Sequence, residues 1–127
     1  MSLLDKLFSK KQPVYRPKMP TWDEIIEHMQ GQELSFFADT IVQVFLSKDR
    51  SKRILILRSD HGYYKTVYEE IRVWDEDEWS YFCNDPDRYP AWWEPVDSAI
   101  NGKSFYGTAE EARKAVIASY EYKAHFV

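Results

Sequence analysis

The sequence is poor in the residues that build several common kinds of site. It has one cysteine, Cys83, and four glycines among 127 residues. A lone cysteine cannot close an intramolecular disulfide, which favours a reducing compartment. Nor can it anchor a structural zinc site by itself. No glycine-rich phosphate loop, nucleophile elbow or zinc-protease motif occurs in the sequence. We therefore expect no cofactor, no metal and no catalytic residue of those classes.

Long hydrophobic runs are also absent. No apolar stretch approaches the ~18 residues that a membrane-spanning helix needs. Asp5 and Lys6 interrupt the apolar start, so we expect no signal peptide. The opening Met-Ser-Leu-Leu-Asp-Lys-Leu-Phe resembles the start of small bacterial cytosolic proteins. This resemblance implies a bacterial protein located in the cytoplasm.

What the chain does contain is apolar and aromatic residues, with charge divided unevenly. Hydrophobic residues make up 44% and aromatic residues 17% of the sequence, enough for a folded core. The net charge is −4, but residues 1–20 carry +4 and residues 21–127 carry −8. An acidic body repels phosphate backbones, so we expect no nucleic acid as partner. We expect a protein partner instead, and one version of this hypothesis has a basic partner.

We predict two parts. Residues 1–20 form a basic amphipathic arm and a proline-containing linker, and residues 21–127 form a single α+β domain. Within the arm, residues 2–10 fit a short amphipathic helix, and the alternatives are docking on the body or on a partner, disorder, or contact with a membrane. Membrane contact by residues 1–11 is the least favoured of these alternatives.

Two capping boxes predict the main helices. Thr21 and Glu24 begin one helix at 22–30, and Thr108 and Glu111 begin another at 109–122. Between them, residues 34–46 fit either a helix or a strand, and we favour a strand at 39–47. An apolar run at 54–57 predicts a strand that is buried on both faces.

The rest of the predicted sheet follows from alternation and turn chemistry. Residues 63–74 read as a long strand, with Val67, Ile71 and Val73 facing inward. Asp75 to Glu78 read as a turn and Trp79 to Phe82 as a fourth strand. Residues 87–102 read as irregular or as a short edge strand, and 104–106 as a last strand. The expected fold is α+β: an antiparallel meander of four to five strands with the two main helices packed on one face, plus the short N-terminal helix.

One segment combines acidic and aromatic residues at high density. Six of the ten residues from Glu69 to Glu78 are carboxylates, and twelve aromatic residues lie between 63 and 106. If Val67, Ile71 and Val73 face inward, the outer face holds Tyr64, Tyr68 and Trp74. Either the C-terminal helix or the proline loop covers them, or they form a recognition surface. The candidate partner-binding residues are Tyr64, Tyr68, Trp74, Asp75, Glu76, Asp77, Glu78, Trp79, Trp92 and Trp93.

Catalytic interpretations have less support. Asp60 and His61 fall in a predicted turn, where both would be solvated, and Cys83 has no basic neighbour that would activate it. An alternative function is a small-molecule binder or small enzyme with a pocket between the sheet and the Trp92-Trp93 loop. In that version Glu70, Glu94 or His61 would supply acid or base.

The leading hypothesis is a non-enzymatic bacterial binding or regulatory protein. Its acidic, aromatic surface would bind a protein partner, one version being an inhibitor or immunity protein that neutralises a basic toxin. A third alternative is a self-assembling homo-oligomer that uses the 1–20 arm.

Overall fold

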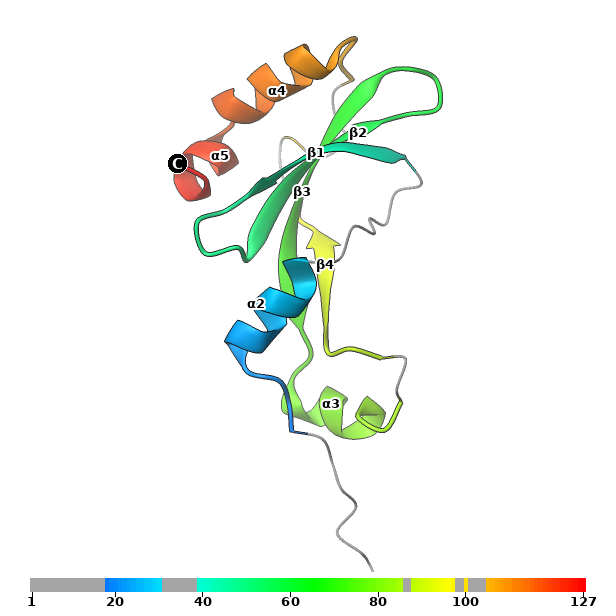
Figure 1. Cartoon of the computed structure of the whole chain (residues 1–127), viewed down its shortest axis with the longest axis vertical. Coiled ribbons are helices and arrows are strands. Elements are labelled where there is room, and N and C mark those ends of the chain that lie inside the picture. Colours follow the sequence, from blue (N-terminus) through cyan, green and yellow to red (C-terminus); the bar gives the residue numbers. More distant parts are fainter. Residues whose placement is uncertain (1–17, 31–38, 86–87, 98–99, 101–104) are drawn as a thin grey trace, which may run out of the picture. The chain divides into compact units, whose positions relative to one another are not determined.

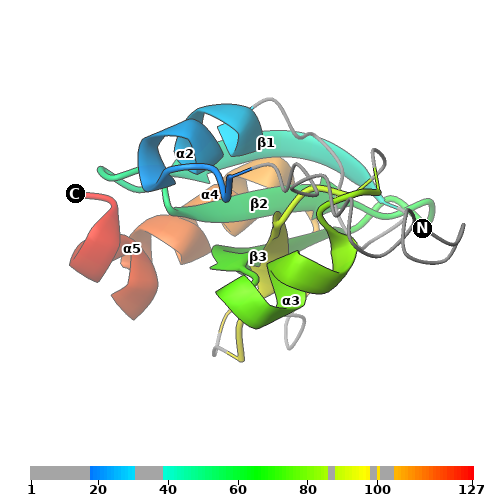
Figure 2. The ribbon, with the colours of Figure 1, turned by 90° about the horizontal axis from the view of Figure 1, so that it is seen from below.

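Four consecutive strands form one antiparallel sheet in the order β1-β2-β3-β4 (Figures 1 and 2). The computed structural model describes residues 18–30, 39–85, 88–97, 100 and 105–127. The strands are β1 (Thr40–Leu46), β2 (Lys52–Arg58), β3 (Tyr64–Val73) and β4 (Ala91–Pro95). The predicted α+β class and antiparallel meander are confirmed. The predicted helix at residues 2–10 lies outside the described residues.

Four helices accompany the sheet in the described part of the chain. They are α2 (Trp22–Gln30), α3 (Glu76–Phe82), α4 (Ala109–Ala118) and α5 (Tyr120–His125). The chain divides into two compact units, and residues 74–90 belong to a different unit from 21–73 and 91–127. The larger unit holds the whole sheet with α2, α4 and α5. The smaller unit holds α3.

The central strand β2 is buried on both faces, as predicted from its apolar run. Ile54 and Ile56 point to one face, which we call the α4 face. Leu55 and Leu57 point to the other, which we call the α2 face. Because side chains alternate along a strand, one apolar run supplies both layers of the core.

On the α4 face, the sheet packs against the C-terminal helices. Tyr68 of β3 clusters with Ile54 and Ile56, and Ala112 and Val116 of α4 close the cluster. The predicted single helix at 109–122 is wrong in one respect, because it breaks at Ser119. That residue adopts extended backbone (ψ 153°), ends α4, and accepts a hydrogen bond from the Tyr122 N–H to begin α5.

On the α2 face, the sheet packs against the first helix. The capping box is confirmed: the Glu24 N–H donates to Thr21 Oγ1 at 3.2 Å, and the Thr21 N–H donates to Glu24 Oε1 at 3.1 Å. The Trp93 indole N–H of β4 donates to the Met29 carbonyl at 3.0 Å.

The placement of the two main helices on one face is wrong. Trp93 lies opposite Ile71, in the same alternating row as Val67 and Leu55. The helix α2, which meets the sheet at Trp93, therefore packs on the face opposite α4 (Figure 1). A strand with apolar side chains on both faces needs packing elements on both faces of the sheet. The apolar run of β2 already indicated this in the sequence.

The segment after β3 differs most from its prediction. Residues 79–82 belong to α3 rather than to a strand. Asp75 begins this helix, and its carboxylate accepts the Glu78 N–H at 2.8 Å. Three acidic residues in the first turn, Glu76, Asp77 and Glu78, favour the helix because they complement its positive N-terminal end.

The last two predicted strands have different outcomes. Residues 91–95 form the short edge strand β4, with Pro90 just before it and Pro95 as its last residue. Around residues 104–106, the described part shows only one isolated bridge, between Tyr64 and Tyr106. This bridge joins the start of β3 to the segment that leads into α4.

The two hairpin turns have clear local causes. In the β1–β2 turn, the Asp49 carboxylate accepts both the Ser47 and the Ser51 hydroxyl at 2.7 Å. The bonds from the Ser51 hydroxyl and the Ser51 N–H, together with that from Ser47, lower the pKa of Asp49 to about 2. In the β2–β3 turn, Gly62 has a φ of +86°, a conformation that side chains disfavour. None of the described helices is long and apolar enough to cross a membrane.

Candidate partner-binding surface

The acidic residues of the candidate surface surround the first turn of α3. Residues 74–90 contain six acidic residues and one basic residue, a net charge of −5, against −8 for residues 21–127. Asp75, Glu76, Asp77 and Glu78 are all exposed. Among the described residues none of these four carboxylates forms an ion pair. Most of the excess negative charge of the body therefore lies in one segment.

Aromatic residues of the same unit pack beside this acidic turn. The Trp74 ring centroid lies 5.2 Å from that of Phe82 and 6.5 Å from that of Trp79. The Arg88 guanidinium lies 4.5 Å from the Phe82 ring centroid. Trp74 and Trp79 are half-buried, whereas Tyr81 is 82% exposed. The residue most open to a partner is thus Tyr81, which the sequence analysis had not selected.

Four other candidate residues belong to the sheet unit. Tyr68 and Trp93 are buried, while Tyr64 and Trp92 are half-buried. Of the two alternatives for Tyr68, the structure shows cover by the C-terminal helices rather than an open face, because residues of α4 and α5 pack against it. Its hydroxyl donates to Glu70 Oε1 at 3.0 Å, and burial raises its pKa. Tyr68 and Trp93 are therefore core residues.

Sequence reasoning missed a buried ion pair on the α2 face. Arg53 Nε lies 2.8 Å from Glu69 Oε1, and the two side chains are 4% and 0% exposed. The Arg53 guanidinium lies 4.4 Å from the Trp93 ring centroid. Glu69 Oε2 is buried with no hydrogen-bond partner in the described structure. Burial raises the pKa of Glu69 and lowers that of Arg53, and the ion pair opposes both shifts.

A signal for this pair was present in the strand pattern. Glu69 shares the alternating row of Val67 and Ile71, and Arg53 shares that of Leu55. A charged residue on an inward row calls for an opposite charge on the neighbouring strand.

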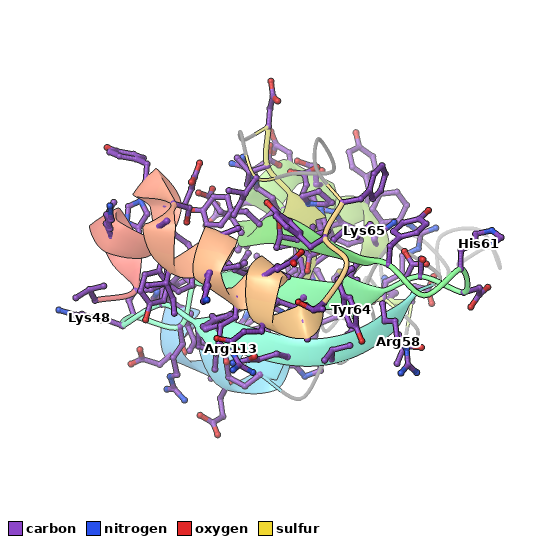
Figure 3. All side chains as sticks on the ribbon, turned by 90° about the horizontal axis from the view of Figure 1, so that it is seen from above. Lys48, Arg58, His61, Tyr64, Lys65 and Arg113 are labelled. Atoms are coloured by element: carbon purple, nitrogen blue, oxygen red, sulfur yellow. The ribbon has the colours of Figure 1, made fainter. Side chains whose placement is uncertain are left out.

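The residues proposed for acid or base chemistry are divided between two places. Glu70 and Glu94 lie opposite each other on β3 and β4. Arg72 Nε lies 2.9 Å from Glu94 Oε2, and Arg72 Nη2 lies 3.9 Å from Glu70 Oε2. His61 projects from the β2–β3 turn (Figure 3) and stacks on Tyr63. The two glutamates therefore both pair with Arg72, toward the end of β3. His61 lies before the start of that strand.

The Trp92-Trp93 segment belongs to β4, the short edge strand that was one of the two alternatives predicted for it. The Trp93 side chain is held between Arg53 and the backbone of α2. In the described ranges, no three histidine, cysteine, aspartate or glutamate residues are placed to hold a metal ion. Comparisons with protein-family models, with curated proteins and with solved structures found no match.

Proposed function

We propose that this chain is a non-enzymatic, cytoplasmic binding or regulatory protein that recognises a basic protein partner. The contact surface is the α3 surface, which we define as Asp75, Glu76, Asp77, Glu78 and Tyr81. The observation that supports the proposal is the accumulation of unpaired, exposed carboxylates beside one exposed tyrosine. Clustered charge of one sign speeds association with an opposite charge, and tyrosine provides apolar contact together with a hydroxyl.

The proposal is narrower than the ten candidate residues suggest. Tyr68 and Trp93 serve the core and are left out of the contact. Trp74, Trp79 and Phe82 instead form the packed aromatic base of the unit that presents α3. An inhibitor of a basic enzyme is the version that best uses electrostatic attraction.

The test is affinity capture from a cell lysate, with the full chain as bait, at low and at high salt. A first variant, Glu76→Gln/Asp77→Asn/Glu78→Gln, removes three charges from the α3 surface and keeps Asp75 as the helix cap. A matched control, Asp23→Asn/Asp60→Asn/Asp97→Asn, removes three exposed charges that form no ion pair among the described residues.

We expect a basic protein to be retained by the wild type and by the control at low salt, and released at high salt. The α3 variant should fail to retain it, although circular dichroism should show that both variants are folded. Equal retention by both variants, or retention indifferent to salt, would refute the proposal.

A further inference from the structure

The two edges of the sheet are protected very differently. The β4 edge is five residues long and ends at Pro95, which has no N–H to offer. Glu94, the residue before this proline, is charged and pairs with Arg72. Short length, proline and charge are the devices that keep sheet edges from pairing with other strands.

The β1 edge lacks these devices. Its seven residues, Thr-Ile-Val-Gln-Val-Phe-Leu, include no charge, proline or glycine. Val42, Val44 and Leu46 are each 44% exposed. In the described residues β2 is its one strand neighbour, and the bulge between Ile41 and Gln43 limits the regular part to Gln43–Leu46. An apolar, β-prone segment of this kind pairs readily with a further strand.

The backbone of β1 has unused hydrogen-bonding groups at this edge. The Ser47 N–H donates to the Lys52 carbonyl of β2 at 2.9 Å. Backbone groups alternate in direction along an antiparallel strand, so those of Phe45 also face β2. The N–H and C=O of Val44 and Leu46 therefore point away from the sheet.

We propose that β1 pairs with β1 of a second copy of this chain, antiparallel and about a two-fold axis. Val44 then lies opposite Leu46 of the second copy, and Leu46 opposite its Val44. Each of these two pairs exchanges two backbone hydrogen bonds. The two four-stranded sheets become one continuous sheet of eight strands, in a symmetric dimer.

We favour a second copy of the chain as the partner of the β1 edge because β1 is suited to pairing with itself. A two-fold axis places the same strand on both sides of the contact. A charged strand would place like charges near each other, whereas β1 has none. In this register, Val42 meets Lys48 and Gln43 meets Ser47, so no like charges become neighbours. Lys48 lies at the end of β1 (Figure 3), clear of the central pairs.

The side-chain contacts of β1 on the two faces of the sheet leave its outer edge accessible. On the α4 face, Arg113 Nε donates to Gln43 Oε1 at 3.1 Å, and Phe45 packs edge-on against Tyr122 at 5.9 Å between centroids. These contacts involve side chains on the α4 face, so they leave the outward N–H and C=O groups of Val44 and Leu46 free. On the α2 face, the exposed Val44 and Leu46 of both copies would form one apolar patch.

The test measures the mass of the full chain in solution by light scattering after size exclusion, over a dilution series. We expect twice 15.2 kDa for the wild type, falling toward 15.2 kDa on dilution. Val44→Lys and Leu46→Glu should each be monomeric, because each new charge then lies opposite an apolar residue and diagonal to the same charge of the second copy. Ile117→Lys, at another exposed apolar position, should remain dimeric.

The register gives a sharper result when the two variants are mixed. Lys at 44 then lies opposite Glu at 46, and the other pair keeps its native Val and Leu. The mixture should recover the dimer mass, and circular dichroism melts should show that both variants are folded. A monomeric wild type, or a mixture that stays monomeric while both variants are folded, would overturn the proposal.

Discussion

The two faces of the sheet fill their cores by different chemistry. The α4 face is closed by apolar and aromatic residues, with Ile54, Ile56 and Tyr68 against Ala112 and Val116. The α2 face adds a buried ion pair, Arg53 with Glu69, beside the Trp93 ring. Apolar packing tolerates modest changes of shape, whereas a buried pair fails when one member is lost. The α2 face should therefore be the more sensitive to single substitutions.

The largest expected effect is the loss of one member of the buried pair. Glu69→Ala removes the carboxylate that pairs with the buried Arg53 charge, and should lower the free energy of unfolding by about 3–5 kcal/mol. The double variant Arg53→Met/Glu69→Leu should recover most of that loss, since both charges are removed. Urea unfolding near neutral pH measures both. Equal destabilisation by the single and double variants would contradict the role given to charge.

On the apolar face, a single truncation should have a smaller effect. Val116→Ala removes two methyl groups from the fully buried α4 interface and should cost about 1–3 kcal/mol. Ile117→Ala, on the neighbouring exposed position, should change stability by less than about 0.5 kcal/mol. A Val116→Ala loss as large as that of Glu69→Ala would remove the contrast between the faces.

The joint between α4 and α5 should contribute less again. Ser119→Ala removes the side-chain oxygen that accepts the Tyr122 N–H at 3.2 Å, and should cost about 1 kcal/mol. Ser119→Thr keeps an acceptor at the same place and serves as the control. Thermal unfolding of the three proteins compares them. If the alanine and threonine variants lose equal stability, packing rather than capping explains the residue.

The smallest effect should come from Asp49 in the β1–β2 turn, and it should depend on pH. Its folded-state pKa of about 2 lies below the ordinary 3.8, so its stabilisation is present above 3.8 and is lost as pH falls through about 2. Asp49→Ala should be less stable than the wild type near neutral pH, and the difference should shrink toward pH 2. Unfolding at several pH values checks this. A constant difference would exclude the carboxylate as its source.

Local signals made much of the fold predictable. The capping boxes located α2 and the start of α4 because they depend on residues three positions apart. Alternation located β3, and the apolar run of β2 indicated burial on both faces. The acidic segment was singled out correctly as exposed, yet its secondary structure was wrong. There, the aromatic content of residues 79–82 favours a strand, but the Asp75 cap and the acidic first turn favour the helix that forms.

The α+β class, the antiparallel meander of the first three strands and the exposed charge at Asp75 to Glu78 could be predicted from the sequence, which left the full strand order open. Each of these depends on neighbouring residues or on strand alternation. The three-dimensional structure was needed to show that Tyr68 and Trp93 are buried, that α2 and α4 cover opposite faces, and that Arg53 pairs with Glu69. These features depend on which segment covers which face of the sheet. The contacts join residues far apart in the chain, and a local sequence pattern does not show which distant residues meet.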